Sequence, residues 1–319
     1  MSENRLAIGI DFGATTIKSG VVFQGHVIDR APPLATREFD APAALIDAMV
    51  RTVAELREKH PGVAGLGVGM PGFVDFAKGL VHGLTNVPNW QSVPLRKILE
   101  EETGLPSVID NRANCMALAE WRLGAARGFR DVVFVNLETG VGGALVANGT
   151  MIRGSRFLAG EIGQTSIDWR GRPGEFGNRG ALEQYTGTDE LAADAQDAYA
   201  AAGIQKSVAD CSLGAMITAA HHGDPVATAR WEEIAAMLAS ALSNCRWLLN
   251  PEVVVVGGSI TRAGELLFDP LRKSLFDGLS HPFTDHLMVV PAAFGHDAGK
   301  IGAAALALEE EHDPGRGRH

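Results

Sequence analysis

The sequence has few cysteines and no long apolar run. Its three cysteines, Cys115, Cys211 and Cys245, are scattered and form no Cys-x-x-Cys pair. This spacing indicates reduced thiols in a cytoplasmic protein and speaks against a redox or metal role. No apolar run reaches the roughly 18 residues of a membrane-spanning helix, and the start "MSENRL" has no signal-peptide pattern.

Positive charge is also scarce. The chain has 28 Lys and Arg against 38 Asp and Glu, a net charge of −10. This balance argues against non-specific binding to nucleic acid or to a membrane surface. With 46% hydrophobic and 21% charged residues, the 319-residue chain is typical of a globular protein with a large core. Its length suggests two domains.

A pattern of three strands occurs twice. "LAIGID", "IKSGVVF" and "HVIDR" are predicted strands, the last two joined by the turn Gln24-Gly25. "VVFVNLE", "GGALVAN" and "TMIRG" repeat this order, with a predicted type I′ turn at Asn148-Gly149. Asp11-Phe12-Gly13 in the first copy matches Glu138-Thr139-Gly140 in the second. This weak duplication predicts two α/β domains that face each other across a cleft.

Helical spacing and breaker residues predict most of the remaining elements. "EVVVVGGS" reads as a buried parallel strand that runs into a glycine turn. The predicted helices are Ala41–His60, Pro94–Thr103, Ala113–Ala126, Asp189–Ala202, Ser212–His222, Asp224–Leu249 and a final helix from about His296.

Three glycine-rich turns have the composition of phosphate-binding loops. Glycine allows backbone N–H groups to approach phosphate oxygens closely. In "DFGATT", Thr15 and Thr16 add hydroxyl donors, and Asp11 can hold Mg²⁺ through water. "ETGVGG" and "VVVVGGS" are the second and third loops, the latter at a strand end where α/β folds bind ligands. Each loop alone is equally compatible with a tight structural turn, but together they favour a nucleotide site.

The order of these blocks resembles a known family. They are "GIDFGATTIKSG", "GVGMPGFVD", "NVPNW", "DNRAN…ALAEWRLGAA", "ETGVGGALVANGTMIRG", "AGEIG", "GNRGALEQY", "PEVVVVGGSITRAG" and "DAGKIGAAALA". In this order and spacing, over nearly the whole chain, they are similar to the ROK family of sugar kinases within the actin–hexokinase superfamily. Because no DNA-binding region precedes Leu6, we expect a kinase and not a member of the repressor branch.

The resemblance implies an α/β, actin-like (ribonuclease H-like) fold of two domains with a central ligand cleft. The smaller domain is expected over residues 1–117 and 296–319, and the larger over 118–295. The resemblance also implies a cytoplasmic homodimer that uses ATP, Mg²⁺ and a small-molecule sugar.

The resemblance assigns roles to residues in the motifs. ATP phosphates are expected at Asp11, Gly13, Thr15, Thr16, Thr139, Gly140 and Gly142, and adenosine at Gly257 and Gly258. A hexose is expected at Asn86, Asn111, Glu161, Gln164 and Glu183, beside Pro71 and Gly72. In the family, an aspartate directly after the Asn111 position takes the proton of the attacking sugar hydroxyl. Mg²⁺ and loop amides stabilise the transferring phosphoryl group.

The sequence departs from the family at that aspartate. The family usually reads Asn-Asp-Ala-Asn, and this chain reads Asn111-Arg112-Ala113-Asn114. A guanidinium stays protonated in proteins and cannot act as a general base. Because the flanking residues fit the pattern, we interpret Arg112 as a true replacement. Asp110 lies two residues early, and its side chain is expected to point elsewhere.

The zinc ligands of the family are missing too. Many members bind zinc through one His and three Cys, whose positions are here Gln164, Gly174, Phe176 and Ala181. None of these is a useful zinc ligand, so we predict no zinc. The family His also contacts the sugar, so Gln164 is expected to alter the sugar pocket.

A third departure is Glu138, where the family commonly has glycine. A carboxylate beside a phosphate loop repels ATP unless a metal or an arginine neutralises it. One hypothesis is that Glu138 and Arg112 form an ion pair. The alternative is that each has a separate partner or points to solvent.

Three functions are compatible with these departures. The first is an ATP-dependent sugar kinase that tolerates Arg112, because a loose phosphoryl-transfer transition state needs little base help. Here Arg112 could also bind an anionic sugar. The second is a sugar-binding pseudokinase. The third is another reaction on a sugar, with Glu138, Glu161, Glu183 or Asp110 as acid or base. The sequence does not identify the sugar.

Overall fold

The computed structural model describes residues 5–84 and 86–310. Contacts divide the chain into two compact units. The first comprises residues 1–127, 153–159 and 296–319, and the second comprises 128–152 and 160–295. The expected boundary after residue 117 falls inside helix α3 (Arg112–Arg122), which the contacts keep whole in the first unit. None of the described helices has both the length and the apolar character needed to cross a bilayer.

The first unit is built on a mixed sheet in the order β3-β2-β1-β5-β9. β1 (Leu6–Phe12), β2 (Thr16–Phe23) and β3 (His26–Arg30) are antiparallel neighbours, and β4 (Leu34–Ala35) also pairs with β2. β5 (Val63–Met70) and β9 (Ser107–Asn111) run parallel to β1. The carboxyl ends of these three parallel strands therefore meet at one edge of the sheet, which is where α/β folds place ligand sites.

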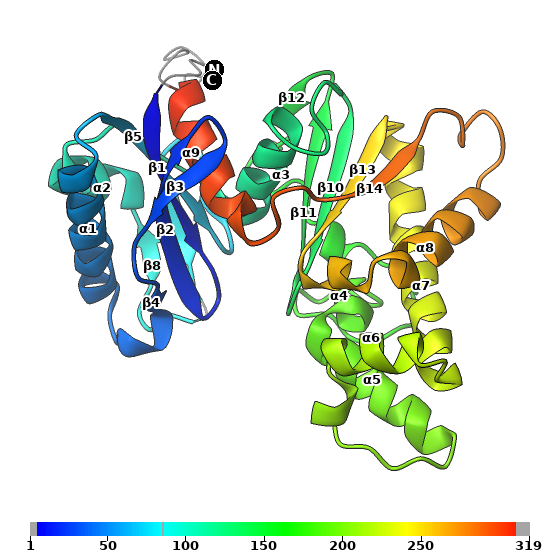
Figure 1. Ribbon diagram of the computed structural model, residues 1–319. Coiled ribbons are helices and arrows are strands. Elements are labelled where there is room, and N and C mark those ends of the chain that lie inside the picture. The colour runs from blue at the N-terminus through cyan, green and yellow to red at the C-terminus, as the bar shows by residue number, and fades with distance from the viewer. Residues whose placement is uncertain (1–4, 85, 311–319) are drawn as a thin grey trace. The chain divides into compact units, whose positions relative to one another are not determined.

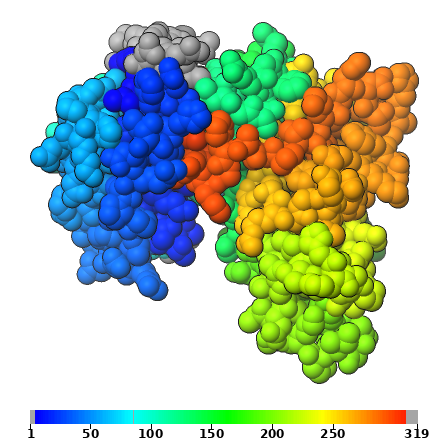
Figure 2. All heavy atoms as spheres, viewed as in Figure 1, coloured from blue at the N-terminus to red at the C-terminus, as the bar shows by residue number. Residues whose placement is uncertain are grey.

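Helices cover both faces of this sheet (Figure 1). α1 (Pro42–Lys59) and α2 (Leu95–Thr103) bury apolar side chains such as Met49 and Leu99 in one cluster with the strands. α3 and α9 (Ala298–Glu310) pack on each other, and α9 also packs on β1 and β5. In Figure 2, the red C-terminal segment lies directly against the blue N-terminal segment, although the two are far apart in the sequence.

A small sheet follows the Pro71-Gly72 turn. It consists of β6 (Val74–Asp75), β7 (Leu80–Gly83) and β8 (Gln91–Val93). The sequence pattern did not predict these strands, because each is only two to four residues long and has no clear alternation.

The second unit repeats the three-stranded start of the first. β10 (Val132–Leu137), β11 (Val141–Ala147) and β12 (Thr150–Met151) are antiparallel neighbours. Asn148 and Gly149 have φ of 53° and 72°, the positive values that a type I′ turn requires. β13 (Val253–Gly257) and β14 (Met288–Pro291) extend the sheet in parallel. The repeat inferred from the sequence is thus confirmed by the strand pairing.

The helices of the second unit pack on this sheet around one apolar cluster. They are α4 (Glu183–Thr186), α5 (Thr188–Ala201), α6 (Leu213–His221), α7 (Pro225–Leu249) and α8 (Glu265–Asp277). Val133 and Val135 of β10 and Leu238 of α7 are buried in the cluster. Asp224 caps α7 by accepting hydrogen bonds from the N–H groups of Val226 and Ala227.

Close contact between α9 and the sheet of the first unit depends on glycine. A Cβ at Gly67 of β5 would lie 1.8 Å from the carbonyl oxygen of Ala303, and one at Gly9 of β1 would lie 1.9 Å from that of Lys300. Helix and strand backbones therefore approach as closely as main-chain atoms allow.

We predict that Gly67→Ala destabilises the first unit by at least about 3 kcal/mol, because the clash is with backbone and cannot be relieved by a side-chain rotation. Gly62→Ala is the matched control, since its Cβ would meet only the Leu6 side chain at 3.6 Å. Urea unfolding of both variants checks the prediction. Equal midpoints for the two variants would contradict it.

Candidate functional site

The residue at the family's base position forms an ion pair. Arg112 is the first residue of α3, and Asp11 lies near the end of β1. The Arg112 Nε lies 2.6 Å from Asp11 Oδ1, and Nη2 lies 3.4 Å from Oδ2. The Asp11 side chain is only 4% exposed and that of Arg112 is 22% exposed. The Arg112 guanidinium thus contacts both oxygens of the carboxylate that was expected to hold Mg²⁺.

Arg112 and Asp11 each offset an unfavourable electrostatic energy of the other. A cation is unfavourable at a helix N-terminus, where the helix dipole is positive, and Asp11 offsets that cost. A buried carboxylate without a partner is strongly destabilising, and Arg112 neutralises it. Gly299, in the first turn of α9, also packs on this carboxylate, because a Cβ there would lie 2.5 Å from Asp11 Cγ.

Asp110 is held by four donors. Its Oδ1 accepts hydrogen bonds from the Asn111 N–H at 2.7 Å and from Asn114 Nδ2 at 3.0 Å. Its Oδ2 accepts from Arg153, with Nε at 2.9 Å and Nη2 at 2.8 Å. The Arg153 guanidinium also stacks on the Phe76 ring, 3.9 Å from its centroid. Asp110 is therefore a structural carboxylate, not one poised for acid–base work.

The expected sugar residues of the first unit organise the strand ends. Asn111 caps α3, since its Oδ1 accepts a hydrogen bond from the Ala113 N–H at 2.8 Å. Its Nδ2 donates to the Gly72 carbonyl at 3.1 Å. The start of α3 is thereby tied to the Pro71-Gly72 turn.

The turn between β1 and β2 is the first expected phosphate loop. Hydrogen bonds within the turn and from residues outside it fix its conformation. The Gly13 N–H donates to the Thr16 carbonyl at 2.9 Å. The Ala14 carbonyl accepts from Asn86 Nδ2 at 2.5 Å and from Thr36 Oγ1 at 3.0 Å. Thr15, at the turn's tip, is exposed. An expected sugar residue, Asn86, therefore contacts the expected phosphate loop.

In the second unit, Glu183 connects the expected sugar residues with the second expected phosphate loop. Its Oε1 accepts a hydrogen bond from Gln164 Nε2 at 3.0 Å, and its Oε2 accepts from the Val141 N–H at 2.7 Å. A Cβ at Gly140 would lie 2.9 Å from Oε2, so glycine is needed for this approach. The expected sugar residues Gln164 and Glu183 therefore meet the expected phosphate loop at Thr139, Gly140 and Gly142.

Glu161 precedes Gln164 and has a perturbed carboxyl group. Burial raises the pKa of Glu161, and the negative charge of Glu183 raises it further. Carboxyl groups with such environments gather at functional sites. Both effects act against the charged form of Glu161.

Glu138 lies where β10 turns into the loop. Its N–H donates to the Gly140 carbonyl and its carbonyl accepts from the Thr188 N–H, both at 2.9 Å. The Arg112–Glu138 ion pair would join residues of different units, and it stays a prediction.

Gly257 is the last residue of β13 and Gly258 follows it, and Gly258 has a structural reason to be glycine. Its φ is 91°, and a Cβ there would lie 2.1 Å from the Leu137 carbonyl oxygen. The packing of this turn on β10 accounts for the glycine, so contact with adenosine stays a prediction.

The segment at the family's zinc position is held by hydrogen bonds. Asn178 Nδ2 donates to the Gln164 carbonyl at 2.8 Å, and the Gly174 N–H donates to the Asn178 carbonyl at 2.9 Å. Within residues 5–84 and 86–310, no group of three or more His, Cys, Asp or Glu could hold a metal ion. The absence of zinc remains a prediction from the residue types at Gln164, Gly174, Phe176 and Ala181.

Asp11 does not fit the role of a Mg²⁺ ligand in this arrangement. The Arg112 guanidinium contacts both Asp11 oxygens, so it occupies one acceptor site on each oxygen and neutralises the carboxylate. A cation there would also face a fixed positive charge. We therefore assign no catalytic step to a metal ion held by Asp11.

Comparison with known proteins decides the family. The model of the ROK family matches residues 7–310. The chain belongs to the ROK family. A glucokinase of Halalkalibacterium halodurans is 32% identical, over 99% of this chain and 98% of its own. The crystal structure of a ROK family glucokinase from Streptomyces griseus, in complex with glucose and AMPPNP, has a TM-score of 0.81 and 32% identity, and it covers 95% of this chain and 99% of its own.

The match confirms the expected two-domain, actin-like α/β fold. Glucokinase relatives support ATP-dependent phosphorylation of a sugar as the general activity. The family also contains repressors, since a putative xylose repressor of Caldicellulosiruptor is 27% identical over 96% of this ROK chain and 78% of its own.

Sequence reasoning missed three groups that build the site. Arg153, which holds Asp110, lies in the block "ETGVGGALVANGTMIRG", but no role was assigned to it. The Thr36 hydroxyl donates to the Ala14 carbonyl. The backbone N–H of Val141 donates to the Glu183 carboxylate. Backbone donors and lone side chains leave no signal in a single sequence.

We predict that Arg112→Asp creates a response to Mg²⁺ that the native protein lacks. The variant should be less stable without metal, because two carboxylates then share one site. At Mg²⁺ about tenfold above its dissociation constant, linkage gives about 1.4 kcal/mol, or roughly 3 °C in Tm.

Arg112→Gln is the matched control, since it breaks the pair without adding a carboxylate and should not respond. Thermal unfolding with EDTA and with Mg²⁺, without nucleotide, measures all three proteins. A native Tm that rises with Mg²⁺ as much as that of Arg112→Asp would contradict the assignment.

Proposed function

We propose that this ROK protein is an ATP-dependent sugar kinase whose phosphoryl transfer works without a carboxylate base at residue 112. The acceptor is a hexose hydroxyl, with hexose contacts from Asn86, Asn111, Glu161, Gln164 and Glu183. ATP phosphates are bound by the turns that contain Gly13 and Gly140.

The observation that carries the proposal is the double role of Glu183. One Glu183 carboxylate oxygen accepts a hydrogen bond from Gln164, an expected sugar residue. The other accepts a hydrogen bond from the Val141 N–H of the expected phosphate loop. A sugar that contacts Glu183 is therefore held in fixed register with the loop that binds the donor. Such positioning is the main source of catalysis in phosphoryl transfer.

The reaction can proceed without a base. The sugar hydroxyl oxygen forms a bond to the γ-phosphorus while the bond to the β–γ bridging oxygen breaks and ADP leaves. In a loose transition state, little charge accumulates on the hydroxyl oxygen, so its proton can leave late, to a phosphoryl oxygen or to water. General-base help is worth about 10²–10⁴ in rate, and a slow kinase is the consequence of losing it.

The Asp11–Arg112 pair favours one second candidate, a sugar-binding protein without phosphoryl transfer. The pair removes both the base and the free carboxylate near the donor, while Asn86, Asn111, Glu161 and Glu183 of the expected sugar site are kept in the sequence. A different acid–base reaction is less well supported, since Asp110 is held by four donors. A cytoplasmic homodimer without zinc completes the proposal and rests on the family resemblance and the residue types.

A coupled ADP-release assay with ATP, Mg²⁺ and a panel of neutral, amino and acidic sugars tests the proposal. The native protein should release ADP with one sugar class. Arg112→Asp should raise kcat by about 10²-fold, since it restores a carboxylate at the base position.

Arg51→Asp, which makes the same charge change on the exposed side of α1, should leave kcat unchanged. Sugar-dependent stabilisation without ADP release by the native protein would favour the sugar-binding candidate. If the native protein shows no ADP release and no stabilisation with any sugar, both candidates are contradicted.

A further inference from the structure

A cavity lies in the first unit and shares no residue with the candidate site. Its volume is about 370 Å³. It is bounded by the end of α3 and the residues after it, by one face of α9, by β2 and by the β2–β3 turn. The lining residues are Arg5, Val22, Gln24, Gly25, Arg122, Leu123, Arg127, Ile301, Ala304, Ala305 and Leu308.

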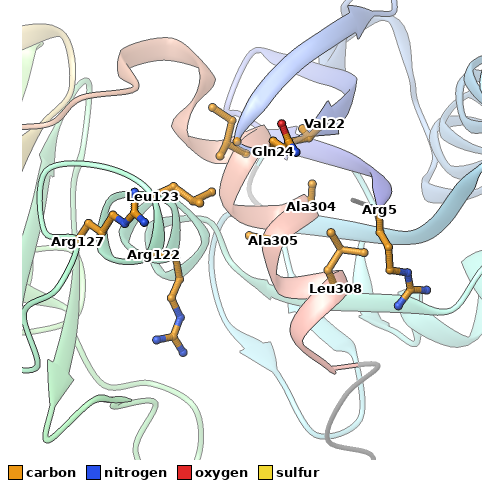
Figure 3. Close-up of a pocket in the computed structure, with 11 residues that line it drawn as sticks. Arg5, Val22, Gln24, Arg122, Leu123, Arg127, Ala304, Ala305 and Leu308 are labelled. Atoms are coloured by element: carbon orange, nitrogen blue, oxygen red, sulfur yellow. The ribbon is translucent and has the colours of Figure 1, made fainter. Parts of the chain in front are cut away.

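Among the described residues, the lining is basic, apolar and, at Gln24, polar, and it contains no Asp or Glu. Figure 3 shows Arg122 and Arg127 on one side and Arg5 on the other, with Ala304, Ala305 and Leu308 of α9 between them. Three arginines at one cavity stand out in a chain whose net charge is −10. Arg122 is partly balanced, since its Nε lies 2.6 Å from Glu309 Oε1. Arg127 is exposed, so its guanidinium is accessible to a ligand.

The chemistry of this lining selects a ligand class. Guanidinium groups bind phosphate and carboxylate through paired N–H donors. The apolar side, formed by Leu123 and the α9 alanines, has no group that could satisfy sugar hydroxyls. The volume falls in the range of small-molecule sites, about 300–1,000 Å³.

We propose that this cavity binds a small organic phosphate with an aromatic or apolar body. The phosphate lies at Arg127, and the body lies on Leu123, Ala304 and Ala305. The site is separate from the Asp11–Arg112 pair, because Arg112 and Arg122 are ten residues apart on α3, or about 15 Å along a helix.

Isothermal titration calorimetry with phenyl phosphate tests the proposal. The native protein should bind phenyl phosphate more tightly than inorganic phosphate, since only the former has an apolar body. Arg127→Gln should weaken binding by about tenfold or more, because a hydrogen-bonded charge pair is lost. Arg51→Gln, an exposed arginine of α1, is the control and should bind like the native protein.

Two further variants locate the ligand. Ala304→Leu, which fills the cavity, should weaken phenyl phosphate binding while circular dichroism shows a folded chain. Arg112→Gln should leave it unchanged. AMP and glucose 6-phosphate as competitors distinguish a nucleotide from a sugar phosphate, and we expect AMP to compete better. No binding of phenyl phosphate, equal binding by Arg127→Gln, or loss of binding in Arg112→Gln would overturn the proposal.

Discussion

The ion pair between Asp11 and Arg112 is the interaction on which the candidate site depends. It joins the end of β1 to the start of α3, and it does so at the edge where three parallel strands end. Breaking such a pair by removing one partner typically costs about 3–5 kcal/mol, since a buried charge is left alone. Around it, Asp110 with Arg153 and Asn111 with Gly72 fasten the neighbouring strand ends. The edge is thus held by charge and hydrogen bonds in addition to the buried side chains of Phe12 and Met70.

This arrangement changes the electrostatics that a nucleotide would meet. Two aspartates at residues 11 and 112 would carry a charge of −2 and attract a divalent cation, whereas Asp11 with Arg112 sums to zero. A neutral pair repels ATP less than two bare carboxylates, but it offers neither a base nor a metal ligand. The second unit keeps its own machinery, with Glu161, Gln164 and Glu183 grouped beside the loop at Gly140. The chain therefore has no carboxylate at residue 112, while Glu183 contacts both Gln164 and the loop at Gly140.

Much of the fold could be predicted from the sequence, because its signals are local. The repeated hairpins follow from alternation and from turns such as Asn148-Gly149, and α7 follows from its Asp224-Pro225 start and its end at Asn250. The strands β6, β7 and β8 were missed because short pieces carry no periodicity. Within the site, the motifs located Arg112 and Glu183, but their partners could not be inferred. The hypothesis that Glu138 pairs with Arg112 stays a prediction. The Asp11 contact, 101 residues away in sequence, depends on strand order that no local pattern encodes.

The most direct test is a crystal structure of the native protein with Mg²⁺, a sugar and a non-hydrolysable ATP analogue. The account predicts that Arg112 Nε stays within about 3 Å of Asp11 Oδ1, the distance of a charge-assisted hydrogen bond, with no metal-bound water on Asp11. Arg112 turned away, with Asp11 bound to Mg²⁺ through water, would contradict it and return the site to the chemistry of its kinase relatives.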